Sequence, residues 1–224
     1  EEYNGSSWTE GNNLNTARLS IAGAGSQTAA VGFGGGYPIS DMNLTEEYNG
    51  TSWSEQNDMS ADRAGHTGFG TQTAAVATAD WPAATTEEYG GTSWTSGGDL
   101  GTARYGMGSA GTLTAGLVFG GSSPLTGKTE EYDGSSWSES GDLNQARAGV
   151  AGSGTQTAAL AFGGFPGPTG QALTERYDGT SWTAAPNLAT ARFYLAGAGT
   201  QALALASGGF SNPNNLNATE EFTF

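Results

Sequence analysis

Charged residues recur at fixed places along this chain and are the first candidates for chemistry. An arginine follows each of five tryptophans by ten residues: Arg18, Arg63, Arg104, Arg147 and Arg192. A glutamate recurs in step with them: Glu46, Glu87, Glu130, Glu175 and Glu220. Arginine clusters can bind carboxylates or phosphates, but a pair repeated in every copy is typical of structural ion pairing. In most copies a second glutamate follows directly, but Arg176 replaces it in one copy. The first glutamate, which is present in every copy, is therefore the predicted partner of the repeat arginine.

Residues for catalysis or metal binding are few. His66 is the sole histidine, and its counterparts in the other repeats are apolar: Ile21, Met107, Val150 and Leu195. The chain has no cysteine, which excludes disulfides and thiolate metal sites. Carboxylates are plentiful, but no spacing singles out an acid–base pair or a calcium-binding run. The sequence therefore predicts no catalytic residue, no metal and no cofactor.

Aromatic residues mark the period of the repeat. Tryptophans recur at intervals of 41 to 45 residues: Trp8, Trp53, Trp94, Trp137 and Trp182. A tyrosine stands five residues before each of them: Tyr3, Tyr48, Tyr89, Tyr132 and Tyr177. That period is the length of one four-stranded propeller blade. We expect these rings to pack between adjacent sheets rather than to bind a ligand.

Short turns predict two hairpins in each repeat. Asn49-Gly50 and its counterparts suit a two-residue type I′ turn, which would place Tyr48 opposite Thr51. A second hairpin is expected over residues 146–164, where Ala158, Leu160 and Phe162 alternate along one strand. Its first strand is rich in small residues, as expected where inner strands crowd around an axis.

The order of these elements resembles the kelch repeat. A diglycine precedes the tyrosine, tryptophan and arginine in four copies, at Gly34-Gly35, Gly120-Gly121, Gly163-Gly164 and Gly208-Gly209, and Ala79-Asp80 replaces it in the second. The resemblance implies an all-β, five-bladed β-propeller of four-stranded antiparallel blades. One domain would span residues 1–224, with repeats starting near residues 1, 45, 86, 129 and 174. We expect residues 219–224 to close the ring by pairing with residues 6–10.

The amino-acid sequences of the repeats are similar to those of repeat domains in virion and tail-fibre proteins of marine bacteriophages. Stretches such as GTQTAA and TEEYDGSSW carry this second resemblance. It implies an extracellular or virion-surface location and membership of a longer chain or a larger assembly.

Net charge narrows the range of partners. The formal net charge is −15, which repels phosphate backbones and anionic lipid surfaces. No apolar run approaches the roughly 20 residues that a membrane span needs. We therefore expect no nucleic-acid partner and no membrane insertion.

Variable loops are the remaining candidates for recognition. The segments after the diglycines differ in every repeat, and four begin with an aromatic residue: Tyr37, Trp81, Phe165 and Phe210. Aromatic rings beside Asn, Asp and Ser suit a glycan or a protein surface. Alternatively, the rings fold down as lids over the blade ends. The sequence thus predicts a non-enzymatic binding or display module, with a purely structural spacer or decoration domain as the alternative.

Overall fold

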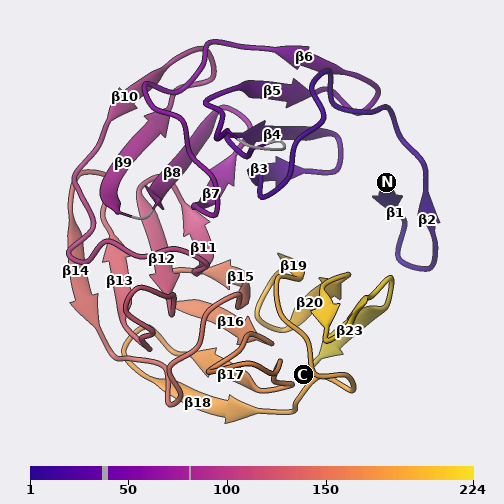
Figure 1. Ribbon diagram of the computed structural model, residues 1–224, viewed down its shortest axis with the longest axis vertical. Helices are drawn as coiled ribbons and strands as arrows, with labels where there is room; N and C mark the ends of the chain where they lie inside the picture. The colour runs from indigo at the N-terminus through magenta and orange to yellow at the C-terminus, as the bar shows by residue number, and fades with distance from the viewer. Residues whose placement is uncertain (37–39, 81) are drawn as a thin grey trace.

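The computed structural model describes residues 1–36, 40–80 and 82–224, and their regular structure is entirely β (Figure 1). Four sheets have four antiparallel strands and a fifth has three, arranged as the blades of a propeller. Blade 1 contains β3 (Ala22–Ser26), β4 (Ala29–Phe33), β5 (Thr45–Tyr48) and β6 (Trp53–Glu55). Blade 2 contains β7 (Thr67–Thr71), β8 (Ala74–Asp80), β9 (Ala83–Tyr89) and β10 (Trp94–Ser96).

The other blades repeat this pattern, with strands a to d running outward from the axis. Blade 3 contains β11 (Gly108–Thr112), β12 (Ala115–Phe119), β13 (Thr129–Tyr132) and β14 (Trp137–Ser140). Blade 4 contains β15 (Ala151–Thr155), β16 (Ala158–Phe162), β17 (Thr174–Tyr177) and β18 (Trp182–Ala185). Blade 5 contains β19 (Ala196–Gly199), β20 (Leu203–Ser207) and β23 (Thr219–Thr223). Two short hairpins lie outside the blades: β1 (Glu2–Tyr3) with β2 (Trp8–Thr9), and β21 (Phe210–Ser211) with β22 (Asn214–Asn215).

The predicted all-β propeller with five antiparallel blades is confirmed, but its predicted closure is wrong. Residues 6–10 do not pair with residues 219–224, because β2 pairs with β1, and β23 pairs with β20. The β1–β2 turn keeps that hairpin intact, so β2 does not serve as an outer strand for β23. Instead the two ends of the chain meet through side chains. Tyr3 Oη donates to Glu221 Oε1 (2.9 Å), and Trp8 Nε1 donates to Thr219 Oγ1 (2.9 Å).

The outer hairpin of each blade also differs from the prediction. Tyr48 lies opposite Trp53 rather than Thr51, so the loop has four residues and is not a type I′ turn. Gly50 is left-handed (φ +86°), whereas Asn49 is not among the residues with positive φ. In blade 1 the Asn49 Oδ1 accepts the amides of Thr51 (3.0 Å) and Ser52 (2.9 Å). Blade 2 has the same four-residue loop with Gly90 at this position, so the register does not depend on that side chain.

Neighbouring blades are joined by an aromatic ring that fits against a glycine. Phe33 of blade 1 packs edge-on against Trp94 of blade 2, with ring centroids 5.0 Å apart. A Cβ on Gly68 would lie 2.4 Å from the Phe33 ring, so the inner strand must be small at this point. Three further pairs join the other blades: Phe69–Trp137, Phe119–Trp182 and Phe162–Phe222.

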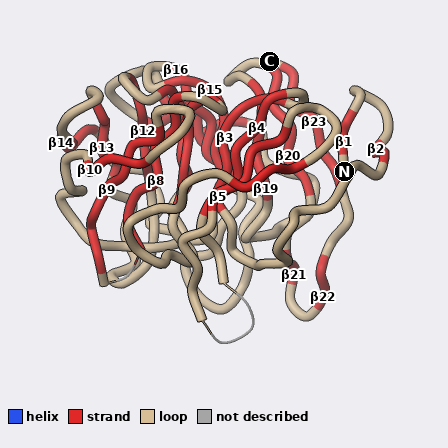
Figure 2. The backbone as a smooth tube through the Cα atoms, turned by 90° about the horizontal axis from the view of Figure 1, so that it is seen from above, coloured by secondary structure: helices blue, strands red, loops and turns tan. Residues whose placement is uncertain are grey.

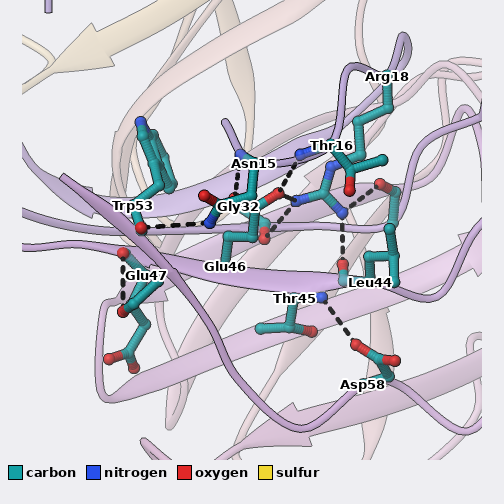
Figure 3. A network of polar contacts seen from close by, with 12 residues as sticks. Asn15, Thr16, Arg18, Gly32, Leu44, Thr45, Glu46, Glu47, Trp53 and Asp58 are labelled. Atoms are coloured by element: carbon teal, nitrogen blue, oxygen red, sulfur yellow. Dashed lines mark hydrogen bonds and ion pairs between the residues drawn. The ribbon is translucent and has the colours of Figure 1, made fainter. Parts of the chain in front are cut away.

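Each repeat arginine is buried against its expected glutamate. The N–O distances are 3.1 Å for Arg18–Glu46, 3.0 Å for Arg63–Glu87 and 3.1 Å for Arg147–Glu175. Arg104–Glu130 and Arg192–Glu220 form the same pair. Figure 3 shows the pair of blade 1, in which Arg18 also donates to the backbone carbonyls of Gly34 and Leu44. Since these carbonyls lie at the two ends of the loop between strands b and c, the arginine clamps that loop.

Removing one arginine tests the structural role of the pair. The Arg147→Ala variant leaves the buried Glu175 carboxylate without its partner. We expect the free energy of unfolding to fall by about 3–5 kcal/mol. The double variant Arg147→Met, Glu175→Leu removes both charges and should regain part of that loss. Chemical denaturation followed by tryptophan fluorescence measures both. An Arg147→Ala variant as stable as the unmodified chain would contradict a structural role.

Candidate functional site

One face of the propeller carries both sets of connecting segments. The loops between strands b and c lie against the segments that lead from strand d to the next strand a. Backbone bridges join the two sets in the described residues: Leu19 with Gly36, Met42 with Arg63, Tyr105 with Ser122, Ala148 with Phe165, Gln171 with Arg192, and Phe193 with Phe210. The β21–β22 hairpin projects from the same side in Figure 2. Both sets therefore emerge on one face, which we call the loop face.

Two of the four predicted loop aromatics fall in the part of the chain that the structure describes. Phe165 and Phe210 are half-buried, and both pack against Phe193, with centroid distances of 4.9 Å and 5.3 Å. Tyr194 lies 5.6 Å from Phe165 and completes a group of four rings, the aromatic cluster. Tyr37 and Trp81 lie outside the described residues. That any of these residues binds a ligand stays a prediction.

Sequence reasoning missed Phe193 and Tyr194, although the repeat itself marks them. The residue pairs at the same two positions of the other copies are Leu19-Ser20, Ala64-Gly65, Tyr105-Gly106 and Ala148-Gly149. Only the fifth copy places a large aromatic residue where the others have glycine or serine. An aligned reading of the five copies would have found this replacement.

Tyr194 has a backbone conformation that rarely suits a large side chain. Its φ is +52°, close to the +60° of Gly149 and the +65° of Gly106 at the same repeat position. The amide of Tyr194 donates to Gly149 O (2.9 Å), and Gly149 and Gly106 continue this chain of hydrogen bonds to Gly65 O. These hydrogen bonds join the left-handed residues of the last four copies. A tyrosine held there is strained, yet 57% of it is exposed.

Phe193, Tyr194 and Phe210 of the aromatic cluster line a central cavity. The cavity has a volume of about 1290 Å³ and is lined by the inner strands and the segments that precede them. Glycine and alanine form much of its wall, while Tyr105, Phe193, Tyr194 and Asn215 contribute larger side chains. Its size is above that of a typical small-molecule pocket. The arrangement can accept an extended polar ligand that stacks on the rim.

The loop face carries the carboxylates Asp41 and Asp80, and its partly exposed cation Lys128 is paired with Glu139. Asp80 accepts the amide of Ala64 at 3.3 Å, and its pKa is raised, chiefly by burial and also by the nearby Asp41. The repeat arginines are held in buried ion pairs, so they do not offset this charge at the surface. Within the described residues no three His, Cys, Asp or Glu side chains converge as a metal site would require. The face suits a neutral or cationic ligand.

His66 lines the cavity but is buried among apolar groups. Its ring lies 5.8 Å from that of Phe33, and neither ring nitrogen has a hydrogen-bond partner among the described residues. Burial, with a smaller contribution from the neighbouring Arg63, lowers the pKa of His66 to about 3. The imidazole is therefore neutral near pH 7 and packs as its apolar counterparts do.

Comparisons with known proteins assign no family to this chain, since no family model and no curated protein matches its sequence. The described segments contain no helix that could cross a membrane. What the loop face can do is therefore argued from its own residues.

Replacing His66 makes the protein less sensitive to acid. The unfolded chain protonates His66 near pH 6.5, whereas the folded chain does so only near pH 3. Stability is therefore lost as the pH falls below 6.5, by up to roughly 1.4 kcal/mol per pH unit from this group. The His66→Leu variant, which copies Leu195, lacks this loss. Denaturation curves at pH 7, 5 and 4 test it, and parallel losses in both proteins would contradict it.

Replacing Tyr194 by glycine separates strain from packing. Glycine relieves the left-handed conformation, so the Tyr194→Gly variant should be as stable as the unmodified chain or up to about 1 kcal/mol more stable. Phe193→Ala is the matched control, and it should be less stable because Phe193 contacts three other rings. Thermal unfolding measures the stability of both variants and of the unmodified chain. An equal loss of stability in the two would show that Tyr194 is a packing residue.

Proposed function

We propose that this chain is a non-enzymatic binding module that recognises a glycan through its loop face. The observation that carries the proposal is Tyr194, a strained and largely exposed tyrosine in the aromatic cluster. Strain in a folded protein persists where the surrounding structure enforces it, and it concentrates at functional sites. A ring fixed beside an open cavity suits stacking against the apolar face of a sugar.

The polar groups near the cluster fit the same class of ligand. Asn215 lines the cavity and pairs with Phe210 across the β21–β22 hairpin. Amide side chains both donate and accept hydrogen bonds, as recognition of sugar hydroxyls requires. A neutral glycan also avoids the repulsion that the acidic surface exerts on anions.

The proposed location of the module follows from the two resemblances of its sequence. Kelch-like repeats provide a rigid scaffold for variable loops. The repeat sequences also resemble those of marine bacteriophage virion and tail-fibre proteins. Both support a module displayed on an extracellular or virion surface. In the alternative function, the same scaffold is a spacer or decoration domain of a larger assembly. A protein ligand at the loop face is the second class of target.

A glycan array compares three proteins. The unmodified chain and the Leu203→Ala variant should bind the same glycans, because Leu203 is exposed at the far end of strand b from the loop face. Tyr194→Ala should weaken that binding by about 10- to 100-fold, the loss typical of a central aromatic contact.

Matched melting temperatures keep the comparison valid. Equal binding by all three proteins would place the site elsewhere. If no glycan binds any of them, the structural spacer becomes the better account of the chain.

A further inference from the structure

Hydrogen bonds from tyrosine to glutamate link five outer hairpins and the single strand β23 in a row of six members. The tyrosine of each hairpin donates to the second acidic residue of the hairpin before it, as Tyr89 does to Glu47 (3.0 Å) and Tyr177 to Glu131 (2.6 Å). Tyr48 and Tyr132 do the same to Glu2 and Glu88. Tyr3 extends the row to β23 by donating to Glu221 (2.9 Å), whereas Phe222 and Arg176 stand where a further pair would link β23 to β17. The β1–β2 hairpin therefore occupies a position of its own, between blade 5 and blade 1.

The inner strands form an open arc. Adjacent a strands pack against one another from β3 through β7, β11 and β15 to β19, and β19 makes no comparable contact with β3. Figure 1 shows this break, with β1–β2 standing at its outer edge. Strand β19 is exposed along its whole length, whereas β15 is buried at alternate residues. We call the space inside β1–β2 the open sector.

The wall of blade 1 that faces the open sector resembles an unfilled blade interface. A groove of about 410 Å³ runs along it, lined by Ile21, Gly23, Gly32 and Trp53 among others. At the other four interfaces, the equivalent tryptophan or Phe222 packs against a phenyl ring from the preceding blade. No ring of the described residues reaches Trp53 in this way, since its aromatic neighbour is Tyr48 of its own hairpin.

Polar groups along the same wall lack the partners that their counterparts have. The side-chain amides of Gln72, Gln156 and Gln201 each donate to two backbone carbonyls of the preceding blade. Gln27, at the same repeat position, reaches only Glu2 Oε2, at 3.4 Å. Glu1 stands where the other repeats have an arginine-paired glutamate, and among the described residues it has no salt-bridge partner.

We propose that the open sector is a docking site for one inner β-hairpin of this same repeat type. Its strand b would pair with the free edge of β1, as β4 pairs with β5 in blade 1. Its phenyl ring would pack on Trp53, its arginine would pair with Glu1, and its strand b carbonyl would accept from Gln27. Together with β1 and β2 the hairpin forms a sixth blade. The interface repeated four times within the molecule defines this occupant, so the inference does not rest on the proposed glycan site.

The first test supplies the hairpin in the same chain. A copy of residues 143–174, fused in front of Glu1, places a complete inner hairpin in register with β1. We expect the melting temperature to rise by roughly 10 °C and amide exchange in Ala22–Ser26 to slow, because a sixth blade covers β3. The control fusion carries Ala in place of the copied Phe162 and Arg147, and it should lose most of the rise.

The second test supplies the hairpin as a separate molecule. A fluorescent peptide of residues 143–174 should bind the unmodified chain at a ratio of one to one. The Ile21→Arg variant places a charge in the groove and should weaken binding at least tenfold. Leu125→Arg, at an exposed site on the loop of blade 3, should leave binding unchanged.

Two results would overturn the proposal. One is a fusion that is no more stable than its control together with a peptide that does not bind. The other is an unmodified chain that sediments as a dimer and becomes a monomer on Ile21→Arg, because a second copy would then be the occupant of the groove.

Discussion

The buried arginine of each repeat is the contact on which the rest of the molecule depends. Arg147 donates to Gly163 O (2.8 Å) and Leu173 O (2.7 Å), the two ends of the loop between strands b and c, and it pairs with Glu175 on strand c. Burial lowers the pKa of Arg147 to about 10, so the guanidinium remains charged at neutral pH. A fixed cation thus holds both ends of a loop whose interior is free to vary. This explains how loops of different length and composition share one scaffold.

Departures from the repeat are as informative as the repeat itself. In blade 2, Thr78 stands where blades 1, 3 and 4 have phenylalanine, and Phe69 on the neighbouring strand supplies the ring that packs against Trp137. Ala79 keeps the left-handed conformation of the glycine that it replaces (φ +58°). These two changes preserve the packing. Tyr194 preserves the backbone but adds strain and exposure, so it requires a reason beyond stability.

Much of this architecture could be predicted from residue spacing alone, because a repeated interface imposes a repeated pattern. The intervals between Trp, Tyr and Arg predicted the blades, and the contrast between Glu175 and Arg176 predicted the ion pair. The hairpin register could not be predicted from the Asn-Gly and Gly-Gly dipeptides, since they also suit a two-residue loop, whereas the observed loops have four residues. The predicted closure was wrong because strand pairing within β1–β2 competes with strand pairing between the two ends of the chain. The aromatic cluster depends on Phe193 and Tyr194, which a reading confined to the variable loops overlooks.

Amide hydrogen exchange in an Arg147→Lys variant tests the central claim most directly. Lysine keeps the positive charge but cannot bond both carbonyls and the carboxylate at once. If the arginine clamps the loop, exchange should become faster over residues 163–173, while strands of blades 1 to 3 and the other loops keep their protection. Exchange that is unchanged in this loop, or that rises equally across all five blades, would contradict the claim that the buried arginine holds the loop face in place.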